Sequence, residues 1–399
     1  MRAATTEPHT AQVLDTPAVL AAVRTVIPAA STNVALHEPE FRGNEWAYVK
    51  ECLDSGWVSS AGKYVDRFES MLSDFTGAAH VVATINGTAA LHISLQLVGV
   101  RRGDEVLIPT LTFVATANAV SYTGATPHFV DSEARTLGVD ATKLEAYLRE
   151  IAEIRDDSCR NRRTGAVIRA LMPMHTFGHP VDLDAVIELC TRWHLALVED
   201  AAESLGSWYH GRHTGNFGRA AGLSFNGNKI VTTGGGGAIL TNDCDIGKVA
   251  KHLTTTARVA HRWSFIHDQV GYNYRLPNLN AALGCAQIER LPDFLARKRR
   301  LAERYIEAFR DVSGVTVMRE PDNCLSNYWL NALLLDHADR TARDAILTAL
   351  NDMGLMVRPV WTLMHWLPMY ANCPRMDLSC AEALEQRIVN VPSSPFLAE

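Results

Sequence analysis

The chain has 399 residues, of which 47% are apolar and 21% charged, and its formal net charge is −6. This composition is typical of a soluble globular protein, and the length predicts two domains. The negative charge argues against a general nucleic-acid-binding protein, which would need a basic face to release counterions from phosphates. No apolar run is long enough to span a bilayer, so we expect no membrane segment and a cytoplasmic location.

The N-terminal region predicts a helical arm over residues 1–33. Its apolar stretch "AVLAAVRTVIPAA" is interrupted by Arg24, which favours a short amphipathic helix over a signal peptide. The eight cysteines of the chain are scattered singly, with no CxxC pair. We therefore expect neither a zinc site nor a disulfide framework, and no metal site of any kind.

From about residue 80 to residue 240, short apolar runs alternate with helical patterns. Strands are predicted at "HVVATI", "DEVLIP", "TPHFVD", "AVIRALMPMH", "LALVED", "GLSFN" and "GAILTND". Helices are predicted at "TAALHISLQLV", "FVATANAVSYTG", "ATKLEAYLREI" and "DLDAVIELCTRWH". This alternation indicates an α/β domain with a largely parallel sheet covered on both faces. Sites on such sheets gather at the carboxyl ends of the strands.

The character of the sequence changes after Pro277. A long helix is predicted there, interrupted near Pro292, and a mixed strand–helix segment follows it. We expect the charged run Arg297–Arg304 to be a solvated helix face. The predicted organisation is thus a large domain over residues 34–285 and a smaller α+β domain over residues 286–399.

The stretch "SFNGNKIVTTGGGG" places Lys229 between a strand-like run and four glycines. A phosphate-binding P-loop is excluded because its glycines precede the lysine and a Ser or Thr follows it. Two hypotheses remain, a lysine that bonds covalently to a carbonyl cofactor and an ordinary surface lysine beside a hairpin. The neighbouring motifs have to decide between them.

Two of these motifs offer phosphate donors. In "NGTAAL", Gly87, Thr88 and Ala89 begin a predicted helix, where free N–H groups and a hydroxyl can bind an anion. Ser224 ends a predicted strand and offers a second hydroxyl. Viewed alone, Gly-Thr before a helix is more often a turn and an N-cap than a binding site.

Two further residues suit a flat, charged ring. Asp200 ends the strand "LALVED", where a carboxylate needs a partner such as a pyridinium nitrogen, although a helix N-cap explains it equally well. Phe113 follows another strand and could stack on a ring, although aromatic residues there are more often core. Phosphate donors, a stacking ring, a carboxylate and a lysine together make the set that pyridoxal phosphate needs.

These motifs resemble the DegT/DnrJ/EryC1/StrS group of sugar aminotransferases, from about Val34 to Pro395. The resemblance implies the type I fold of pyridoxal-phosphate-dependent aminotransferases, with Lys229 forming a Schiff base to the cofactor. In "EDAAESLG", it implies that Asp200 binds the ring nitrogen and that Glu203 lies near the ring hydroxyl. The segment resembling the phosphate-binding turn is "NGTAAL", with Ser224 joining it.

The resemblance also implies a homodimer with shared active sites. The segment "HDQVGYNYRLPNLN" resembles one that reaches the neighbouring subunit's site, which implicates Asn273, Arg275 and, as part of the same polar cluster, His267. In "MPMHTFGHPVDLD", the resemblance places His175 close to the cofactor. One departure is that four glycines stand where many relatives have Gly-Glu-Gly-Gly after the lysine. Dehydratases of this fold replace the lysine with histidine, so Lys229 favours amino transfer.

For the substrate, the terminal segments resemble the LegC-like branch of the family. This implies amination of C4 of UDP-4-keto-6-deoxy-N-acetylglucosamine with glutamate as donor, as in bacillosamine or legionaminic acid formation. GDP-perosamine-type synthesis is the nearest rival, and another transferase or dehydratase, or a non-enzymatic pyridoxal-binding regulator, are more distant alternatives. Trp57, Trp361 and Trp366 could offer apolar faces to a sugar or base, and Arg358 could bind a pyrophosphate. Alternatively, the tryptophans are core residues and Arg358 is the partner in a surface ion pair.

Overall fold

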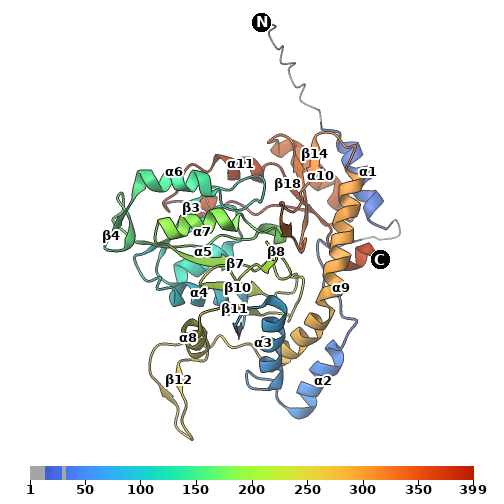
Figure 1. Cartoon of the computed structure of the whole chain (residues 1–399). Coiled ribbons are helices and arrows are strands. Elements are labelled where there is room, and N and C mark those ends of the chain that lie inside the picture. Colours follow the sequence, from blue (N-terminus) through green and yellow to red (C-terminus); the bar gives the residue numbers. More distant parts are fainter. Residues whose placement is uncertain (1–13, 29–32) are drawn as a thin grey trace.

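A computed structural model describes residues 14–28 and 33–399 of the chain. Its centre is a seven-stranded sheet in the order β1-β11-β10-β7-β6-β2-β3 (Figure 1). Only β11 runs against its neighbours β1 and β10, and every other adjacent pair is parallel. The prediction of a largely parallel sheet is therefore confirmed. The strands, in chain order, are β1 (His80–Thr84), β2 (Glu105–Pro109), β3 (Thr126–Val130), β6 (Ile168–Leu171), β7 (Ala196–Asp200), β10 (Ala220–Ser224) and β11 (Gly237–Thr241).

Five helices follow or connect these strands. They are α4 (Gly87–Leu97), α5 (Val114–Tyr122), α6 (Ala141–Ile151), α7 (Leu183–Arg192) and α8 (Cys244–Thr254). Four of them begin at a residue whose side chain accepts a hydrogen bond from the backbone N–H three positions on, namely Asn86, Asp140, Asp182 and Asp243. Such N-caps satisfy one of the free donors of the first turn and fix where each helix begins. The predicted order of strands and helices matches the observed order.

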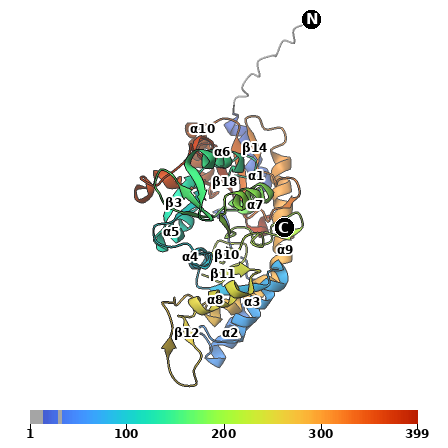
Figure 2. The same cartoon turned by 60° about the vertical axis from the view of Figure 1, so that its left-hand side comes forward.

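The sequence analysis missed several short elements of the large domain. A hairpin of β4 (Ala152–Arg155) and β5 (Ser158–Asn161) follows α6, and a three-stranded sheet joins β8 (Trp208–Tyr209), β9 (Arg212–His213) and β15 (Cys324–Leu325). A short 3-10 helix, η1 (Thr176–Gly178), lies between β6 and α7. The hairpin of β12 (Arg258–Val259) and β13 (Ile266–His267) projects from the body in both views (Figures 1 and 2).

The long helix α9 (Asn278–Ala308) runs through Pro292 without a break, so the predicted interruption is wrong. It extends from α2 (Glu45–Ser55) and α3 (Lys63–Thr76) up to the second domain (Figure 1). Pro292 removes one N–H from the helix ladder, but packing against α2, α3 and α1 (Thr16–Val26) holds the helix on both sides of it.

The charged run of α9 is not a solvated face, and that prediction is also wrong. Arg297 is buried and donates to both carboxylate oxygens of Glu40, at 2.8 and 2.9 Å. Lys298 is fully buried and donates to two backbone carbonyls, those of Trp329 and Ser393. Burial lowers the pKa of Lys298 well below its usual value. These cations hold α9 against segments that lie far away in the sequence, which composition alone does not reveal.

The second domain is built on an antiparallel sheet in the order β14-β16-β18-β17. Its strands are β14 (Val315–Val317), β16 (Asn331–Leu335), β17 (Arg358–Pro359) and β18 (Ile388–Val391), with α10 (Arg340–Asp352) and α11 (Ser379–Glu385) beside them. Three 3-10 helices complete it: η2 (Met364–Trp366), η3 (Pro368–Tyr370) and η4 (Pro395–Ala398). Helix α1 contributes Val19 and Val23 to the apolar core of this domain. The predicted boundary at residue 285 falls inside α9, and most of the predicted N-terminal arm lies outside the described residues.

None of the helices in the described ranges is both long enough and apolar enough to cross a membrane.

Candidate active site

A cavity of about 400 Å³ lies at the carboxyl edge of the central sheet. The strands β1, β2, β7 and β10 all end there, and because β11 runs the other way, its first residue Gly237 meets Ser224 and Thr84 at the same edge. A Cβ at Gly237 would lie 2.5 Å from the backbone of Asn86, so only glycine allows this approach. The lining residues come from both domains: Asn86, Gly87, Thr88, Leu91, Phe113, Ala115, Thr116, Met174, Asp200, Ala202, Glu203, Ser224, Asn226, Asn228, Lys229, Gly235, Gly236, Trp329 and Trp361.

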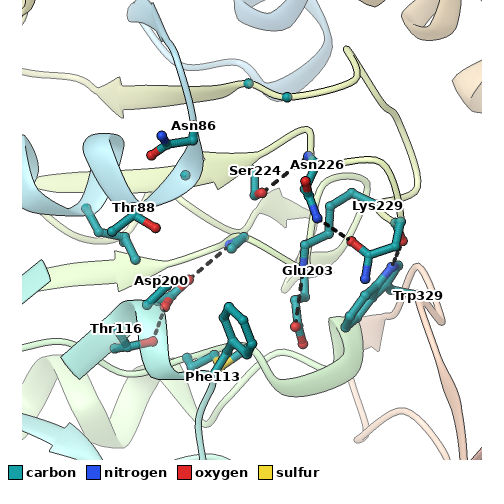
Figure 3. Close-up of a pocket in the computed structure, with 18 of the residues that line it drawn as sticks. Asn86, Thr88, Phe113, Thr116, Asp200, Glu203, Ser224, Asn226, Lys229 and Trp329 are labelled. Atoms are coloured by element: carbon teal, nitrogen blue, oxygen red, sulfur yellow. Dashed lines mark hydrogen bonds and ion pairs between the residues drawn. The ribbon is translucent and has the colours of Figure 1, made fainter. Parts of the chain in front are cut away.

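One wall of the cavity is the first turn of α4. Gly87 and Thr88 begin this helix, so their N–H groups have no intrahelical partner and remain available to an anion. The N–H of Ala89 is engaged by the Asn86 side chain at 2.7 Å, which leaves Ala89 out of the donor set that the sequence suggested. The Ser224 hydroxyl faces the same region (Figure 3). This wall suits a phosphate.

Asp200 lies at the end of β7, with its carboxylate buried beside α5. Its Oδ2 accepts a hydrogen bond from the Thr116 hydroxyl at 2.6 Å, and its Oδ1 accepts one from the N–H of Ala202 at 3.2 Å (Figure 3). Burial raises the pKa of this carboxyl, and the two hydrogen bonds oppose the rise. A buried carboxylate that lines a cavity is suited to the protonated nitrogen of a ring.

Lys229 follows β10 and enters the cavity beside Glu203. Its Nζ lies 3.2 Å from Glu203 Oε1, and Glu203 Oε2 accepts a hydrogen bond from the N–H of Phe177 at 2.9 Å. Burial raises the pKa of Glu203 to about 7, although the charge of Lys229 opposes this rise. The lysine side chain is only 13% exposed, so it is not the surface residue of the alternative hypothesis.

Phe113 projects into the cavity from the loop after β2 (Figure 3). Its side chain is 49% exposed, which excludes the interpretation as plain core. The edge of its ring contacts Trp361, with the ring centroids 6.2 Å apart. The two aromatic side chains give the cavity an apolar part of its lining.

His175 does not line the cavity in this structure. It is fully buried, its Nε2 lies 3.1 Å from Glu199 Oε2, and its Nδ1 accepts a hydrogen bond from the N–H of Val181. Glu199 also accepts hydrogen bonds from three backbone N–H groups. These bonds and His175 lower the pKa of Glu199, although burial opposes the change. His175 therefore supports the end of β7 from behind the cavity.

Three suggested substrate residues also lie outside the cavity of their own chain. Trp57 lines a separate recess with Tyr64 and Asn278. Arg358 is exposed on β17 and donates to Asn351, and His267 is exposed on the projecting hairpin. A role for them in substrate binding stays a prediction.

Asn273 and Arg275 lie in the segment between the projecting hairpin and α9. They form isolated bridges with Thr255 and Thr84, and Arg275 lines a small recess that also includes Lys251. Neither residue belongs to the cavity around Lys229 in its own chain. A role for them in the neighbouring subunit's site stays a prediction.

Several lining residues were missed by the sequence analysis. Trp329 comes from the second domain, just before β16. Asn226 and Asn228 precede Lys229 on its own loop. Thr116 reaches Asp200 from the first turn of α5. In the sequence, only the proximity of Thr116 to a strand end indicated that it could line the site. Nothing near Trp329 in the sequence did so, because Asn228, which accepts its side-chain hydrogen bond, lies 101 residues away in the chain.

The donor set fits pyridoxal phosphate. Gly87, Thr88 and Ser224 can hold a phosphate, Asp200 a ring nitrogen, and Lys229 a carbonyl carbon, while Phe113 offers an aromatic face. Within the described residues, no group of three or more His, Cys, Asp or Glu side chains is arranged to hold a metal ion.

The comparisons with known proteins agree with this donor set. The sequence profile of the DegT/DnrJ/EryC1/StrS aminotransferase family matches residues 39–399. The chain is 38% identical over 369 residues to the GDP-perosamine synthase of Caulobacter vibrioides, covering 92% of this chain and 94% of the relative. It is 36% identical to the GDP-perosamine synthase of Escherichia coli O157:H7, again covering 92% and 94%. The structure of the aminotransferase TlmJ from Streptoalloteichus hindustanus superposes with a TM-score of 0.81 at 28% identity, covering 91% of this chain and 94% of that one. The chain therefore belongs to the DegT/DnrJ/EryC1/StrS aminotransferase family and is a pyridoxal-phosphate-dependent sugar aminotransferase.

Proposed function

We propose that this enzyme transfers an amino group from glutamate to the C4 ketone of a GDP-linked 4-keto-6-deoxy sugar. The observation that carries the choice of nucleotide is the match to GDP-perosamine synthases from three organisms, at 35% to 38% identity over 92% of the chain. This match supports the GDP sugar better than the UDP-linked N-acetyl sugar that the terminal segments of the sequence suggested.

In the proposed mechanism Lys229 moves the proton. When bound, pyridoxal phosphate supplies a carbonyl that exchanges nitrogen and a ring that accepts electrons. Lys229 Nζ takes the proton from the carbon of the amino donor in one half of the reaction and delivers one to the sugar carbon in the other. Asp200 keeps the ring nitrogen protonated, and the Thr116 hydroxyl fixes the orientation of the Asp200 carboxylate.

The polar residues around Lys229 suit a sugar substrate. Asn226 and Asn228 line the cavity and are hydrogen-bonded to each other at 3.1 Å, so their remaining amide groups can bind hydroxyls. Trp361 and Phe113 offer apolar faces on the other side.

We also propose that the enzyme is a homodimer in which each active site is completed by the partner. Asn273 and Arg275 do not reach the cavity of their own chain. Large apolar side chains are exposed near the first residues of α2 and on the projecting hairpin: Trp46 at 80%, Trp263 at 72% and Phe265 at 78%. Exposed apolar surface of this extent is typical of an interface.

The substrate proposal is tested by comparing kcat/KM for GDP-4-keto-6-deoxymannose with that for UDP-4-keto-6-deoxy-N-acetylglucosamine, with glutamate as donor. We expect a clear preference for the GDP sugar, because a site that pairs the polar groups of one sugar leaves them unpaired with the other. The Lys229→Ala variant provides the background rate for both sugars. Preference for the UDP sugar would show that the nucleotide assignment is wrong. Turnover of neither sugar would exclude both substrates.

A further inference from the structure

The amine of Lys229 lies between two side chains in the cavity. Its Nζ lies 3.2 Å from Glu203 Oε1 and 3.8 Å from the centroid of the Trp329 ring. Both partners are buried, at 1% exposure for the Glu203 side chain and 4% for Trp329. A carboxylate and an indole face both attract a cation, and this attraction is stronger where water is excluded.

The Trp329 ring is fixed relative to Lys229. Its Nε1 donates to the carbonyl of Asn228, the residue directly before Lys229, at 2.7 Å (Figure 3). Its own carbonyl accepts a hydrogen bond from the buried Lys298 at 3.0 Å. The indole therefore cannot turn away from the lysine without breaking a hydrogen bond to the loop that carries this lysine.

Asn327 holds both partners of the lysine in place. Its Nδ2 donates to the carbonyls of Glu203 and Leu205, at 2.8 and 2.9 Å, and its Oδ1 accepts a hydrogen bond from the N–H of Trp329 at 2.8 Å. The side chain is fully buried, and the two bonds from its Nδ2 join the second domain to the loop after β7. One amide thus sets the distance between Glu203 and Trp329.

We propose that Asn327 and Trp329 are positioning residues that build a resting place for the Lys229 amine while it carries the proton. Lys229 needs such a place during turnover, when the substrate nitrogen has displaced it and its side chain would otherwise be free to rotate. Held against Trp329 and Glu203, the ammonium stays inside the cavity between accepting a proton and delivering it. This inference rests on the proposed role of Lys229 as the reacting lysine.

The test uses cofactor-free enzyme and does not depend on turnover. The protein is treated with limiting acetic anhydride, and acetylation of Lys229 is measured by mass spectrometry of its peptide. Because Trp329→Leu removes one of the two contacts that hold the amine, the acetylation rate of Lys229 should rise about tenfold. Trp329→Phe keeps an aromatic face and should restore most of the protection, and Asn327→Ala should behave like Trp329→Leu.

Two controls separate this effect from opening or unfolding of the cavity. Trp361→Leu removes a ring from the same cavity and should leave the acetylation rate of Lys229 unchanged. Lys248, which is 71% exposed on α8, should react equally in every variant that is folded. The inference is overturned if Trp329→Leu leaves Lys229 as protected as in the wild type, or if Trp361→Leu exposes it equally. Either result would leave the proposed aminotransferase function standing, since that function is tested by product formation.

Discussion

Glu203 is a buried carboxyl whose protonation is linked to folding. Burial raises its pKa from 4.5 to about 7, so the folded protein keeps this proton between pH 4.5 and 7 while the unfolded chain has released it. Stability must then fall as the pH rises through this window, by on the order of 3 kcal/mol from this group. The destabilisation is absent below pH 4.5 and complete above pH 7.

We therefore predict that Glu203→Gln flattens the pH dependence of stability. Urea unfolding of the cofactor-free protein at pH 5 and pH 8 should show a smaller loss between the two values in the variant than in the wild type. The glutamine keeps the shape of the side chain and one acceptor, which can serve Phe177, while the titration and the charge that faces Lys229 are removed. Parallel pH profiles for the two proteins would contradict the raised pKa.

The role proposed for Asp200 at the ring nitrogen depends on its charge rather than on its hydrogen bonds. Asp200→Asn keeps an acceptor for the Thr116 hydroxyl but removes the negative charge that would face the ring nitrogen. We predict that the variant still binds pyridoxal phosphate, while both half-reactions slow by on the order of 100-fold in single-turnover assays. Unchanged single-turnover rates would show that Asp200 does not serve the ring nitrogen.

At the scale of elements, η1 and the segment before β16 approach each other through Gly178. This glycine has a φ of +95°, and a Cβ at its position would lie 1.8 Å from Asn327 Oδ1. Gly165 has a φ of +77°, but no atom lies within 4 Å of its built Cβ. The two positions thus share a left-handed backbone and differ in crowding.

Gly178→Ala should accordingly destabilise the protein far more than Gly165→Ala. Backbone strain alone costs about 1 kcal/mol at Gly165, and displacement of the buried Asn327 should bring the loss at Gly178 to about 3 kcal/mol or more. Thermal or urea unfolding measures both variants. Equal losses would mean that the contact between Gly178 and Asn327 is not tight.

The buried pair of Arg297 and Glu40 fastens α9 to the segment before α2. Hydrogen bonds from Arg297 lower the pKa of Glu40, so the pair stabilises the fold above pH 4.5 and this contribution is lost as the pH falls below that value. Glu40→Gln should cost about 3 kcal/mol at pH 7, because it leaves a buried guanidinium without its main partner. The difference from the wild type should shrink near pH 3.5.

A surface pair provides the control for this prediction. Glu188, whose side chain is 71% exposed, pairs with Arg192 on α7, and Glu188→Gln should change the free energy of unfolding by about 0.5 kcal/mol at most. Urea denaturation of both variants at the two pH values makes the comparison. A Glu40→Gln variant as stable as Glu188→Gln would contradict the structural role of the buried pair.

The sequence predicted the elements of the central sheet in their order because their apolar runs are long and bounded by Gly, Pro or Asp. It singled out Gly87, Thr88, Asp200 and Lys229, which line one cavity, because each lies at the end of such a strand or a few residues after it. It could not predict that α9 continues through Pro292 or that Lys298 is buried, since both depend on partners distant in sequence. The same limit applies to Trp329, which is placed beside Lys229 by Asn327 and by the loop that it contacts.

At the scale of the whole molecule, the account requires that two chains share their active sites. Neither the lysine variant Lys229→Ala nor Arg275→Ala should be active alone. After mixing with exchange of subunits, each hybrid has one site with both residues intact, so about a quarter of wild-type activity should return under random reassortment. Mixing two batches of Lys229→Ala is the control. A fully active monomer in sedimentation experiments would rule out the shared site.

Lys229 is proposed as the residue through which this chain holds its cofactor. The most direct test is to reduce the cofactor-loaded enzyme with borohydride, digest it, and locate the added mass by mass spectrometry. The account predicts that the mass of the reduced cofactor is found on the peptide containing Lys229, and that adding glutamate before reduction abolishes the adduct. An adduct on a different lysine, or one that persists unchanged with glutamate, would contradict it.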